Sequence, residues 1–413
     1  MKSSRIVIAT IGSLGDLHPC LALALELQRR GHRPVISTTP FYAARVQELG
    51  LEFHAMRPDW SPADSDLIRQ CEDLKSGPEI LYRKMVLPQL PGTYEDLLAV
   101  ARTADLLLAG ELVYAAPLVS EKLKLPWASI ILSPFSFFSA IDPSVMVNAP
   151  RLIHLRKLGV RPYRMALDLG RLATRHWSNP VRDLRRREGL RVECDPVFRD
   201  KFSPWLVLAL FSKALAAAQP DWPPQTVQPG FLQFESPADP NLVAQLTDFL
   251  SEGDPPIVFT QGSTAVHHPG EFYEVSAAAA MRLGRAILLG IKTDPKLPGV
   301  LALPYMPYSR LFPHAAAIVH QGGSGTTGDA LRAGRPMLFV PYGWDQPDNA
   351  ARIERQGAGL HVPRAKYTVD TATAALHRLL DDPQFARQAG KLGRVIAAED
   401  ALRQACDAIE SLL

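Results

Sequence analysis

Residues 317–350 read AIVHQGGSGTTGDALRAGRPMLFVPYGWDQPDNA, and the predicted fold follows from this stretch. Its apolar start, Ile318-Val319, is typical of the end of a buried strand. A Gly-rich turn follows at 321–327, residues 329–333 favour a helix, and residues 336–341 predict a second strand bounded by prolines. A strand, a Gly-rich turn and a helix in this order form an anion site. The glycines let the backbone approach a phosphate, and the helix start favours negative charge.

Polar side chains at the ends of the predicted strands extend this anion site. His320 ends the first strand and can donate to the same phosphate. Asp345 and Gln346 follow the second strand, where ligands of open parallel sheets bind. Ser263 follows another predicted strand, at 257–260, and either donates to phosphate or only stabilises its turn. A phosphate site followed by a pair that binds hydroxyls suggests a nucleotide sugar.

The spacing of these residues resembles a known signature. His-x-Gly-Gly-x-Gly-Thr-Thr, Ala-Gly-x-Pro and Pro-x-x-x-Asp-Gln are similar to the donor motif of family 1 glycosyltransferases. The resemblance implies an α/β protein of the GT-B fold, with two Rossmann-like doubly wound parallel sheets facing a cleft. Within the family it resembles most the bacterial branch of sterol, macrolide and glycopeptide glycosyltransferases and the rhamnolipid rhamnosyltransferase. A structural Gly-rich turn in an ordinary α/β protein is the alternative.

Composition limits the class of protein. A chain of 413 residues is too long for one ordinary core, and 47% hydrophobic with 21% charged residues is typical of a soluble globular protein. The net charge of +3 does not indicate nucleic-acid binding. The basic stretch at 182–191 predicts a solvated helix face, with contact to anionic lipid as the alternative. No run approaches the roughly 20 apolar residues of a membrane span. We therefore expect a cytoplasmic protein, with association at the inner face of the membrane left open.

The four cysteines are scattered without Cys-x-x-Cys spacing, which predicts free thiols rather than a disulfide or a zinc site. They are Cys20, Cys71, Cys194 and Cys406.

Strands and helices alternate through both halves, which predicts a doubly wound sheet in each. We predict strands at 5–11, 34–38, 51–55, 105–110, 127–132, 205–212, 257–260, 286–289 and 300–303. Helices are predicted at 19–31, 42–49, 115–123, 163–177, 242–251, 271–282, 369–380 and 383–413. The Pro-rich segment after Gln219 marks the change of domain. The predicted parts are an N-terminal acceptor domain at 1–218, a linker at 219–240, a donor domain at 241–390 and a terminal helix at 391–413. The resemblance implies that this helix crosses back to the N-terminal domain.

The resemblance assigns the donor site residue by residue. The family uses a histidine and a helix start in place of a metal, and no DxD-like pair stands where a metal would bridge a diphosphate. The implied phosphate-binding residues are His320, Gly322, Gly323, Ser324, Gly325, Thr326 and Thr327, with Ser263 as an addition. Asp345 and Gln346 match the sugar-binding pair, and Tyr305, Met306 and Tyr308 fall where the nucleobase is bound. Gly328 replaces a ribose-binding Glu of plant members, which leaves Asp329 or another loop for the ribose.

The catalytic and acceptor residues come from the N-terminal half. The plant motif is Gly-His-x-x-Pro, and the matching segment here is Gly15-Asp16-Leu17-His18-Pro19. The match puts Asp16 at the position of the catalytic base, so Asp16 is preferred to His18. Pro19 in the first helical turn would leave Asp16 in the loop before the helix. Glu111 falls near the carboxylate that orients the plant histidine, and it otherwise lines the acceptor pocket or caps a helix. The acceptor-pocket candidates are Phe135, Phe137, Phe138 and Trp344, for which core packing is the alternative.

These residues predict an inverting, metal-independent glycosyltransferase that uses a UDP- or TDP-sugar and a small apolar acceptor. It needs no cofactor beyond the nucleotide sugar, which is a co-substrate, and acts as a monomer or homodimer. A nucleotide-sugar epimerase or hydrolase of the same fold and a catalytically silent activator are the alternatives. A dinucleotide oxidoreductase is disfavoured because the first turn, GSLGD, lacks Gly-x-Gly-x-x-Gly.

Overall fold

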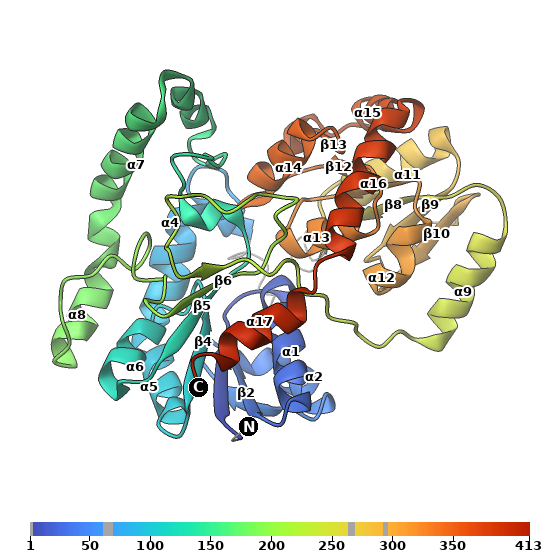
Figure 1. The fold of residues 1–413 in the computed structure, drawn as a ribbon. Coiled ribbons are helices and arrows are strands. Elements are labelled where there is room, and N and C mark those ends of the chain that lie inside the picture. The colour runs from blue at the N-terminus through green and yellow to red at the C-terminus, as the bar shows by residue number, and fades with distance from the viewer. Residues whose placement is uncertain (1–2, 61–68, 263–268, 292–295) are drawn as a thin grey trace. The chain divides into compact units, whose positions relative to one another are not determined.

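The computed structural model describes residues 3–60, 69–262, 269–291 and 296–413, which form two compact units (Figure 1). The first unit comprises residues 1–213, 217–234 and 400–413, and the second comprises 214–216 and 235–399. Each unit contains one sheet whose paired strands are all parallel. The predicted α/β class with two doubly wound parallel sheets is confirmed. No helix in the described ranges has both the length and the apolar character needed to cross a membrane.

The sheet of the first unit has the order β3-β2-β1-β4-β5-β6-β7. Its strands are β1 Arg5–Ala9, β2 Arg33–Thr38, β3 Glu52–Ala55, β4 Leu106–Gly110, β5 Trp127–Ile131, β6 Leu206–Ala209 and β7 Thr226–Val227. The adjacent strands β1, β4, β5 and β6 are almost wholly buried, as their runs of Ile, Leu, Val and Ala require. The strand order reverses between β1 and β4, so the loops after these two strands diverge at the position where such sheets bind ligands.

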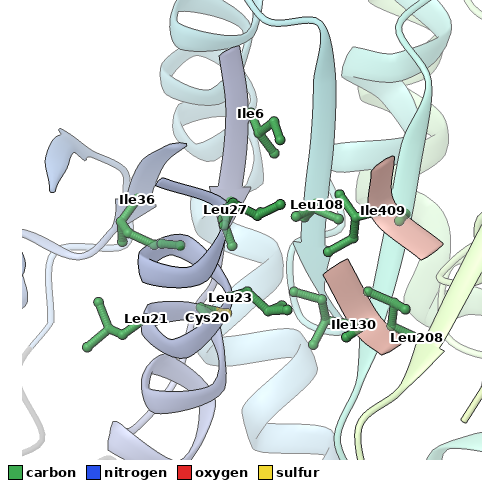
Figure 2. Close-up of a cluster of buried hydrophobic side chains, with 14 of the residues drawn as sticks. Ile6, Cys20, Leu21, Leu23, Leu27, Ile36, Leu108, Ile130, Leu208 and Ile409 are labelled. Atoms are coloured by element: carbon green, nitrogen blue, oxygen red, sulfur yellow. The ribbon is translucent and has the colours of Figure 1, made fainter. Parts of the chain in front are cut away.

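The first unit also contains helices and 3-10 segments. They are α1 Leu14–Arg29, η1 Pro40–Tyr42, α2 Ala43–Glu48, α4 Gly77–Ile80, the π-helix η2 Leu81–Val86, η3 Leu87–Gln89, α5 Leu90–Ala101, α6 Ala116–Leu123, η4 Pro134–Phe137, η5 Pro150–Leu158, α7 Val160–Thr174, η6 Arg175–Ser178, α8 Asn179–Arg187 and α17 Ala401–Glu410. In the core, Leu23 and Leu27 of α1 lie with Leu108 of β4, Ile130 of β5 and Ile409 of α17 (Figure 2).

The end of the chain differs from the prediction of one helix over 383–413. The structure has α16 Pro383–Ala397 in the second unit and α17 in the first. The two helices bury different apolar faces, Phe385 and Ile396 on α16 but Cys406 and Ile409 on α17, so the chain must turn between them. Polar contacts also fix α17, because Arg30 bonds both Asp407 and Glu410 at 2.7 Å.

The predicted linker at 219–240 also differs from the structure. Trp222 is buried, with its ring stacked on Phe137 at a centroid distance of 4.0 Å. β7, which follows it, pairs with β6 as the last strand of the first sheet. The chain therefore leaves the first unit only after Phe234. Proline made the segment a poor candidate for an inner strand, but an edge strand tolerates it.

The sheet of the second unit has the order β10-β9-β8-β11-β12-β13 and reverses between β8 and β11. Its strands are β8 Ile257–Thr260, β9 Ala286–Leu289, β10 Val300–Leu303, β11 Ala317–His320, β12 Met337–Phe339 and β13 Gly359–His361. Its helices are α9 Pro240–Ser251, α11 Phe272–Leu283, α12 Tyr308–Leu311, η7 Phe312–His314, α13 Ser324–Arg332, α14 Gln346–Arg355, η8 Arg364–Lys366, α15 Val369–Asp381 and α16. The Gly-rich turn after β11 thus lies at the reversal point of this sheet.

Candidate functional site

The Gly-rich turn of the second unit joins β11 to α13. Gly322 has φ +98°, and a Cβ there would lie 3.0 Å from Cδ1 of Phe339 and 3.2 Å from the carbonyl oxygen of Gln346. Backbone conformation and space therefore both require glycine at this position. Gly323 is extended and forms the N-cap of α13, so the helix begins at Ser324 rather than at Asp329 as predicted.

The start of α13 has no side-chain cap among the described residues. The first-turn N–H groups of Ser324, Gly325 and Thr326 have no intrahelical acceptor, as at any helix start. The N–H of Thr327 donates to the carbonyl oxygen of Gly323 at 2.9 Å, so this backbone donor is already paired within the helix. A Cβ on Gly325 would have no heavy atom within 4 Å in the described part of the chain. An uncapped helix start beside open space favours an anion.

His320 supplies a further donor next to this helix start. The ring is fully buried, and its Nδ1 accepts the N–H of Gly322 at 3.1 Å. Burial lowers the pKa of His320 to about 3, so the ring is neutral at ordinary pH. With Nδ1 as acceptor, the proton of the neutral ring is on Nε2. Nε2 has no hydrogen-bond partner among the described residues, which makes it a buried donor that lacks an acceptor.

A small network ties the Gly-rich turn to the start of α14. Oδ2 of Asp345 accepts from the Ser324 hydroxyl at 2.7 Å and from Nδ2 of Asn349 at 2.9 Å. Asn349, which is buried, also donates to the carbonyl oxygen of Gly322 at 2.9 Å. Burial raises the pKa of Asp345. The network fixes Asp345 relative to the Gly-rich turn.

Gln346 has a structural contact that the sequence did not predict. Its Oε1 accepts from the backbone N–H groups of Tyr342 at 2.7 Å and Gly343 at 3.2 Å. Within the turn that it holds, Trp344 has a left-handed backbone with φ +56°. Such strain persists only where the surroundings impose it. The amide oxygen of Gln346 therefore shapes the loop that carries Asp345 and Trp344.

The three nucleobase candidates have different environments. Tyr305 is 38% exposed, whereas Met306 is buried in the core. Tyr308 stacks on Phe312 at a centroid distance of 4.3 Å, and its hydroxyl lies 3.3 Å from Oγ1 of Thr260. Packing thus accounts for Met306 and Tyr308, and Tyr305 is the most exposed of the three. Ser263 lies outside the described residues.

In the first unit, Asp16 lies inside α1 rather than in the loop before it. It is the third residue of the helix and forms a capping box with the N-cap residue Ser13. Its Oδ2 accepts from the Ser13 N–H at 2.8 Å, and the Ser13 hydroxyl accepts from the Gly15 N–H at 3.1 Å. Gly12 leaves room for this carboxylate, because a Cβ there would lie 2.2 Å from Oδ2. The prediction of Asp16 in a loop is wrong, since the capping pair starts the helix before Pro19.

His18 lies two residues after Asp16 in the same turn of α1, and one of its ring nitrogens is occupied by a contact. Nη1 of Arg45 lies 3.1 Å from its Nε2, and the ring packs against Phe234 at a centroid distance of 4.9 Å. Burial, with Arg45 nearby, lowers the pKa of His18 to about 4. A ring nitrogen that accepts from a guanidinium is poorly placed to take another proton.

Glu111 follows β4, and both of its carboxylate oxygens have partners. Nζ of the buried Lys201 donates to Oε1 at 2.7 Å, and the Ser136 hydroxyl donates to Oε2. Nζ of Lys201 also lies 4.9 Å from the centroid of the Phe138 ring. Glu111 therefore joins three segments of the first unit. These contacts support the structural alternative for Glu111 over a catalytic role.

The acceptor-pocket candidates separate into core and half-buried residues. Phe137 is buried and stacks between Trp222 and Phe202, so core packing, the alternative, accounts for its position. Phe135 and Phe138 are half-buried and lie 5.8 Å apart between ring centroids. Trp344 belongs to the second unit.

Sequence reasoning missed the residues that support the site. Asn349 stands four positions after Asp345 on the same helix face, a spacing that could have indicated the contact. Lys201 has no such signal, because it is far from Glu111 in sequence. None of the four cysteines is in a disulfide, as predicted. In the described ranges, no cluster of His, Cys, Asp or Glu side chains is arranged to hold a metal ion.

Comparison with known protein families gives two matches. Residues 6–122 match the glycosyltransferase family 28 N-terminal domain. Residues 291–411 match the C-terminal domain described as erythromycin biosynthesis protein CIII-like.

Individual proteins resemble the chain over nearly its whole length. O-mycaminosyltylonolide 6-deoxyallosyltransferase of Streptomyces fradiae is 33% identical, with 98% of this chain and 97% of that protein covered. A sterol 3-beta-glucosyltransferase of Arabidopsis thaliana is 28% identical over 98% of this chain and 65% of its own length. Among solved structures, a spinosyn rhamnosyltransferase complexed with thymidine diphosphate has a TM-score of 0.69 at 20% identity, with 98% and 100% of the two chains covered. A likeness at 20% identity shows only that the two proteins share a fold, the GT-B fold of glycosyltransferases.

Proposed function

The chain belongs to the family 1 glycosyltransferases, in the branch that includes macrolide and sterol enzymes, and on this premise we propose that it transfers a sugar with inversion and without a metal. The donor is a UDP- or TDP-linked sugar, and the acceptor is a hydroxyl of a small apolar molecule. The nucleotide sugar is a co-substrate, and no further cofactor is required. The observation that carries the proposal is the buried Nε2 donor of His320 beside an uncapped helix start.

The departing diphosphate is the group that these donors fit. When the bond between the anomeric carbon and the diphosphate breaks, negative charge grows on the phosphate oxygens. The N–H groups of Ser324, Gly325 and Thr326 together with Nε2–H of His320 are donors fixed in advance, so they need little reorganisation as that charge develops. Since burial keeps His320 neutral, it acts as a hydrogen-bond donor rather than as a cation. These donors supply the charge stabilisation that a metal provides in other transferases.

Asp345 is the residue that we assign to the sugar. Its Oδ2 is held by Ser324 and Asn349, so Oδ1 is the oxygen that would accept from a sugar hydroxyl. Gln346 supports the same loop through its amide oxygen. The exposed ring of Tyr305 is the surface that we assign to the nucleobase. It stacks on uracil or thymine alike, so it does not separate UDP from TDP.

Asp16 is the base that we assign to the acceptor hydroxyl. The acceptor oxygen attacks the anomeric carbon from the face opposite the diphosphate, the bond to the diphosphate breaks, and the hydroxyl proton goes to the Asp16 carboxylate. One displacement inverts the anomeric centre. The capping box supports this role because it holds the carboxylate in one position at the end of an inner strand. The half-buried rings of Phe135 and Phe138 favour an apolar acceptor.

Replacing His320 by alanine tests the proposal. We expect kcat to fall by about 10²–10³-fold, the usual effect of removing one such donor. His361→Ala is the matched control, because this histidine ends another strand of the same sheet but is exposed and paired with Glu354 at 2.7 Å. Activity of wild type should persist in EDTA. Wild-type turnover by His320→Ala, or loss of activity in EDTA that magnesium restores, would contradict the phosphate mechanism.

A further inference from the structure

The most exposed large apolar side chains of the described residues gather in one segment of the first unit. Leu158, Met165, Leu169 and Leu172 are 73%, 66%, 66% and 64% exposed, more than any other large apolar side chain in the described ranges. Leu158 ends η5, and the other three lie on α7. Large apolar side chains that cluster on a surface indicate an interaction site, whereas isolated ones do not.

The exposed residues of α7 form one face of the helix. Met165, Leu169 and Leu172 have the spacing i, i+4, i+7, which places them along a single stripe. Tyr163 is the only residue of the helix that is buried, and helical geometry puts it on the opposite side. Figure 1 shows α7 at the outer side of the first unit, away from its sheet. The apolar stripe therefore faces away from the core that anchors the helix.

The same segment carries strong positive charge. Residues 150–176 contain seven Lys and Arg side chains and one carboxylate, Asp168. Arg161 and Arg175 are exposed and lie beside the apolar stripe in helical projection, and the exposed Lys157 precedes the helix. A helix with one apolar face flanked by cations fits the interfacial region of an anionic membrane. The charge also disfavours a second copy of the same face, since two such surfaces repel each other.

The neighbouring basic helix α8 lacks these features. Arg185 is buried and donates to Glu121 at 2.6 Å, and Arg186 pairs with Asp183 at 2.8 Å. Its apolar residues Val181 and Leu184 are buried. The Arg-rich stretch that first suggested lipid contact is therefore a solvated face with an anchored apolar side, and the unsupported apolar face is on α7.

We propose that the segment 150–176 docks the protein on anionic lipid bilayers, with Met165, Leu169 and Leu172 inserted among the lipid chains. Lys157, Arg161 and Arg175 contact the anionic headgroups. Lys and Arg side chains have long apolar stems, so they can reach the headgroups while the stripe is inserted. This surface stands independently of the proposed function, since it uses none of the residues assigned to donor or acceptor.

Cosedimentation with lipid vesicles tests the docking surface. Wild type should bind vesicles of phosphatidylcholine mixed with phosphatidylglycerol but not phosphatidylcholine alone, and binding should weaken as salt is raised. The triple variant Met165→Gln, Leu169→Gln, Leu172→Gln should lower the partition coefficient by at least about tenfold. The triple variant Lys157→Gln, Arg161→Gln, Arg175→Gln should lower it on the order of a hundredfold.

Two matched variants serve as controls. Arg182→Gln, Arg186→Gln, Arg187→Gln removes the same number of charges from α8. Met281→Gln, Leu380→Gln, Val395→Gln replaces three exposed apolar side chains of the second unit, which are 48%, 39% and 37% exposed. Both should bind anionic vesicles like wild type. All these variants should keep the wild-type circular dichroism spectrum, because they change surface residues.

Three outcomes would overturn the proposal. Wild type could fail to bind anionic vesicles, or the α8 variant could lose as much vesicle binding as the α7 charge variant. Sedimentation velocity could instead show that wild type is a dimer, that the apolar α7 variant is a monomer, and that neither binds vesicles. The stripe would then be a contact between two copies of the chain.

Discussion

The two strand-to-helix turns after β1 and β11 have the same place in their sheets but opposite helix starts. Each follows an inner strand at the point where the strand order reverses. At α1, Ser13 and Asp16 form a capping box, so the chain's own side chains satisfy the helix start. At α13 the N-cap is Gly323, and no side-chain cap is present among the described residues. The first turn thus holds a carboxylate of its own, whereas the second has donors without an acceptor.

This difference assigns a different chemistry to each turn. A carboxylate at the start of α1 already occupies the place that favours negative charge, so a phosphate there would be repelled. The open start of α13 lies beside His320, whose neutral ring adds a donor without a competing positive charge. Under the proposed function, the same strand-turn-helix arrangement supplies the proton acceptor in the first unit and the anion site in the second.

Asp16→Asn should remove the proton acceptor while keeping the shape of the first turn. We expect kcat for transfer to a hydroxyl to fall by about 10²–10⁴-fold, as for loss of a general base. Donor affinity measured by calorimetry should stay unchanged, because the second turn is intact.

Asp16→Asn also weakens the capping box and so lowers stability, and Ser13→Ala is the control for that loss. It removes the hydroxyl that caps Gly15, which should lower the free energy of unfolding by about 1 kcal/mol. The carboxylate of Asp16 remains, so kcat should stay within about tenfold of wild type. If Ser13→Ala were as inactive as Asp16→Asn, the role of Asp16 would be structural.

Gly323→Asp should convert the second turn into the capped type. The extended backbone of Gly323 suits any N-cap residue, and a new carboxylate would accept from the first-turn N–H groups. We expect donor affinity to fall roughly 10- to 100-fold, because the phosphate loses charge-assisted hydrogen bonds and meets a like charge. Thermal stability should hold or rise.

Gly323→Ala is the control for Gly323→Asp, because it adds a Cβ without adding a negative charge. A Cβ at this position lies 3.3 Å from Nε2 of Gln321, the end of a flexible side chain that can move. Donor affinity of this variant should stay close to wild type. Equal loss in both variants would mean that the site rejects bulk rather than charge.

The sequence predicted the strands better than the starts of the helices. Strands β8, β9 and β10 have the predicted bounds, because turn residues on both sides of a short apolar run fix where the strand begins and ends. α1 begins at Leu14 although Pro19 suggested a later start. Ser13 and Asp16, three residues apart, carried the signal for that start.

The site was predictable only where its residues are close in sequence. The Gly-rich turn and Asp345 lie within one stretch, and their spacing indicated a common site. The partners of Glu111 and His18 could not be predicted, because Lys201 and Arg45 lie beside them in the fold but far from them in sequence. Such long-range contacts decide whether a polar residue is available for chemistry, and a single sequence does not record them.

The neutral state of His320 should make stability depend on pH. Burial lowers its pKa in the folded protein to about 3, whereas in the unfolded chain it titrates near 6.5. Protonation therefore favours the unfolded chain. The stabilising contribution of the neutral ring is present above about pH 6.5 and is lost as pH falls towards about 3, by at most ~1.4 kcal/mol per pH unit.

Thermal unfolding of wild type and His320→Gln between pH 7 and pH 5 measures this contribution. The wild-type midpoint should fall more steeply than that of the variant, because only wild type loses the neutral-ring contribution. Parallel pH profiles would show that the ring is accessible to protons in the folded state and is no buried donor.

His18→Ala should have the smallest effect, although this histidine lies in the same turn of α1 as the proposed base. Its Nε2 already accepts from Arg45 at 3.1 Å, and burial lowers its pKa to about 4, so it has little capacity to take a proton from an acceptor. We expect kcat to fall by about tenfold or less, equivalent to about 1.4 kcal/mol, from lost packing against Phe234. Arg45→Gln is the companion variant, because it removes the contact to Nε2 while keeping the His18 ring. If His18 has no catalytic role, kcat of Arg45→Gln should equal that of wild type. The measurement is kcat with a single acceptor for both variants and for Asp16→Asn, with donor affinity by calorimetry. Near-normal turnover by Asp16→Asn beside an inactive His18→Ala would exchange the two roles, and the capping box of α1 would then be only the start of a helix.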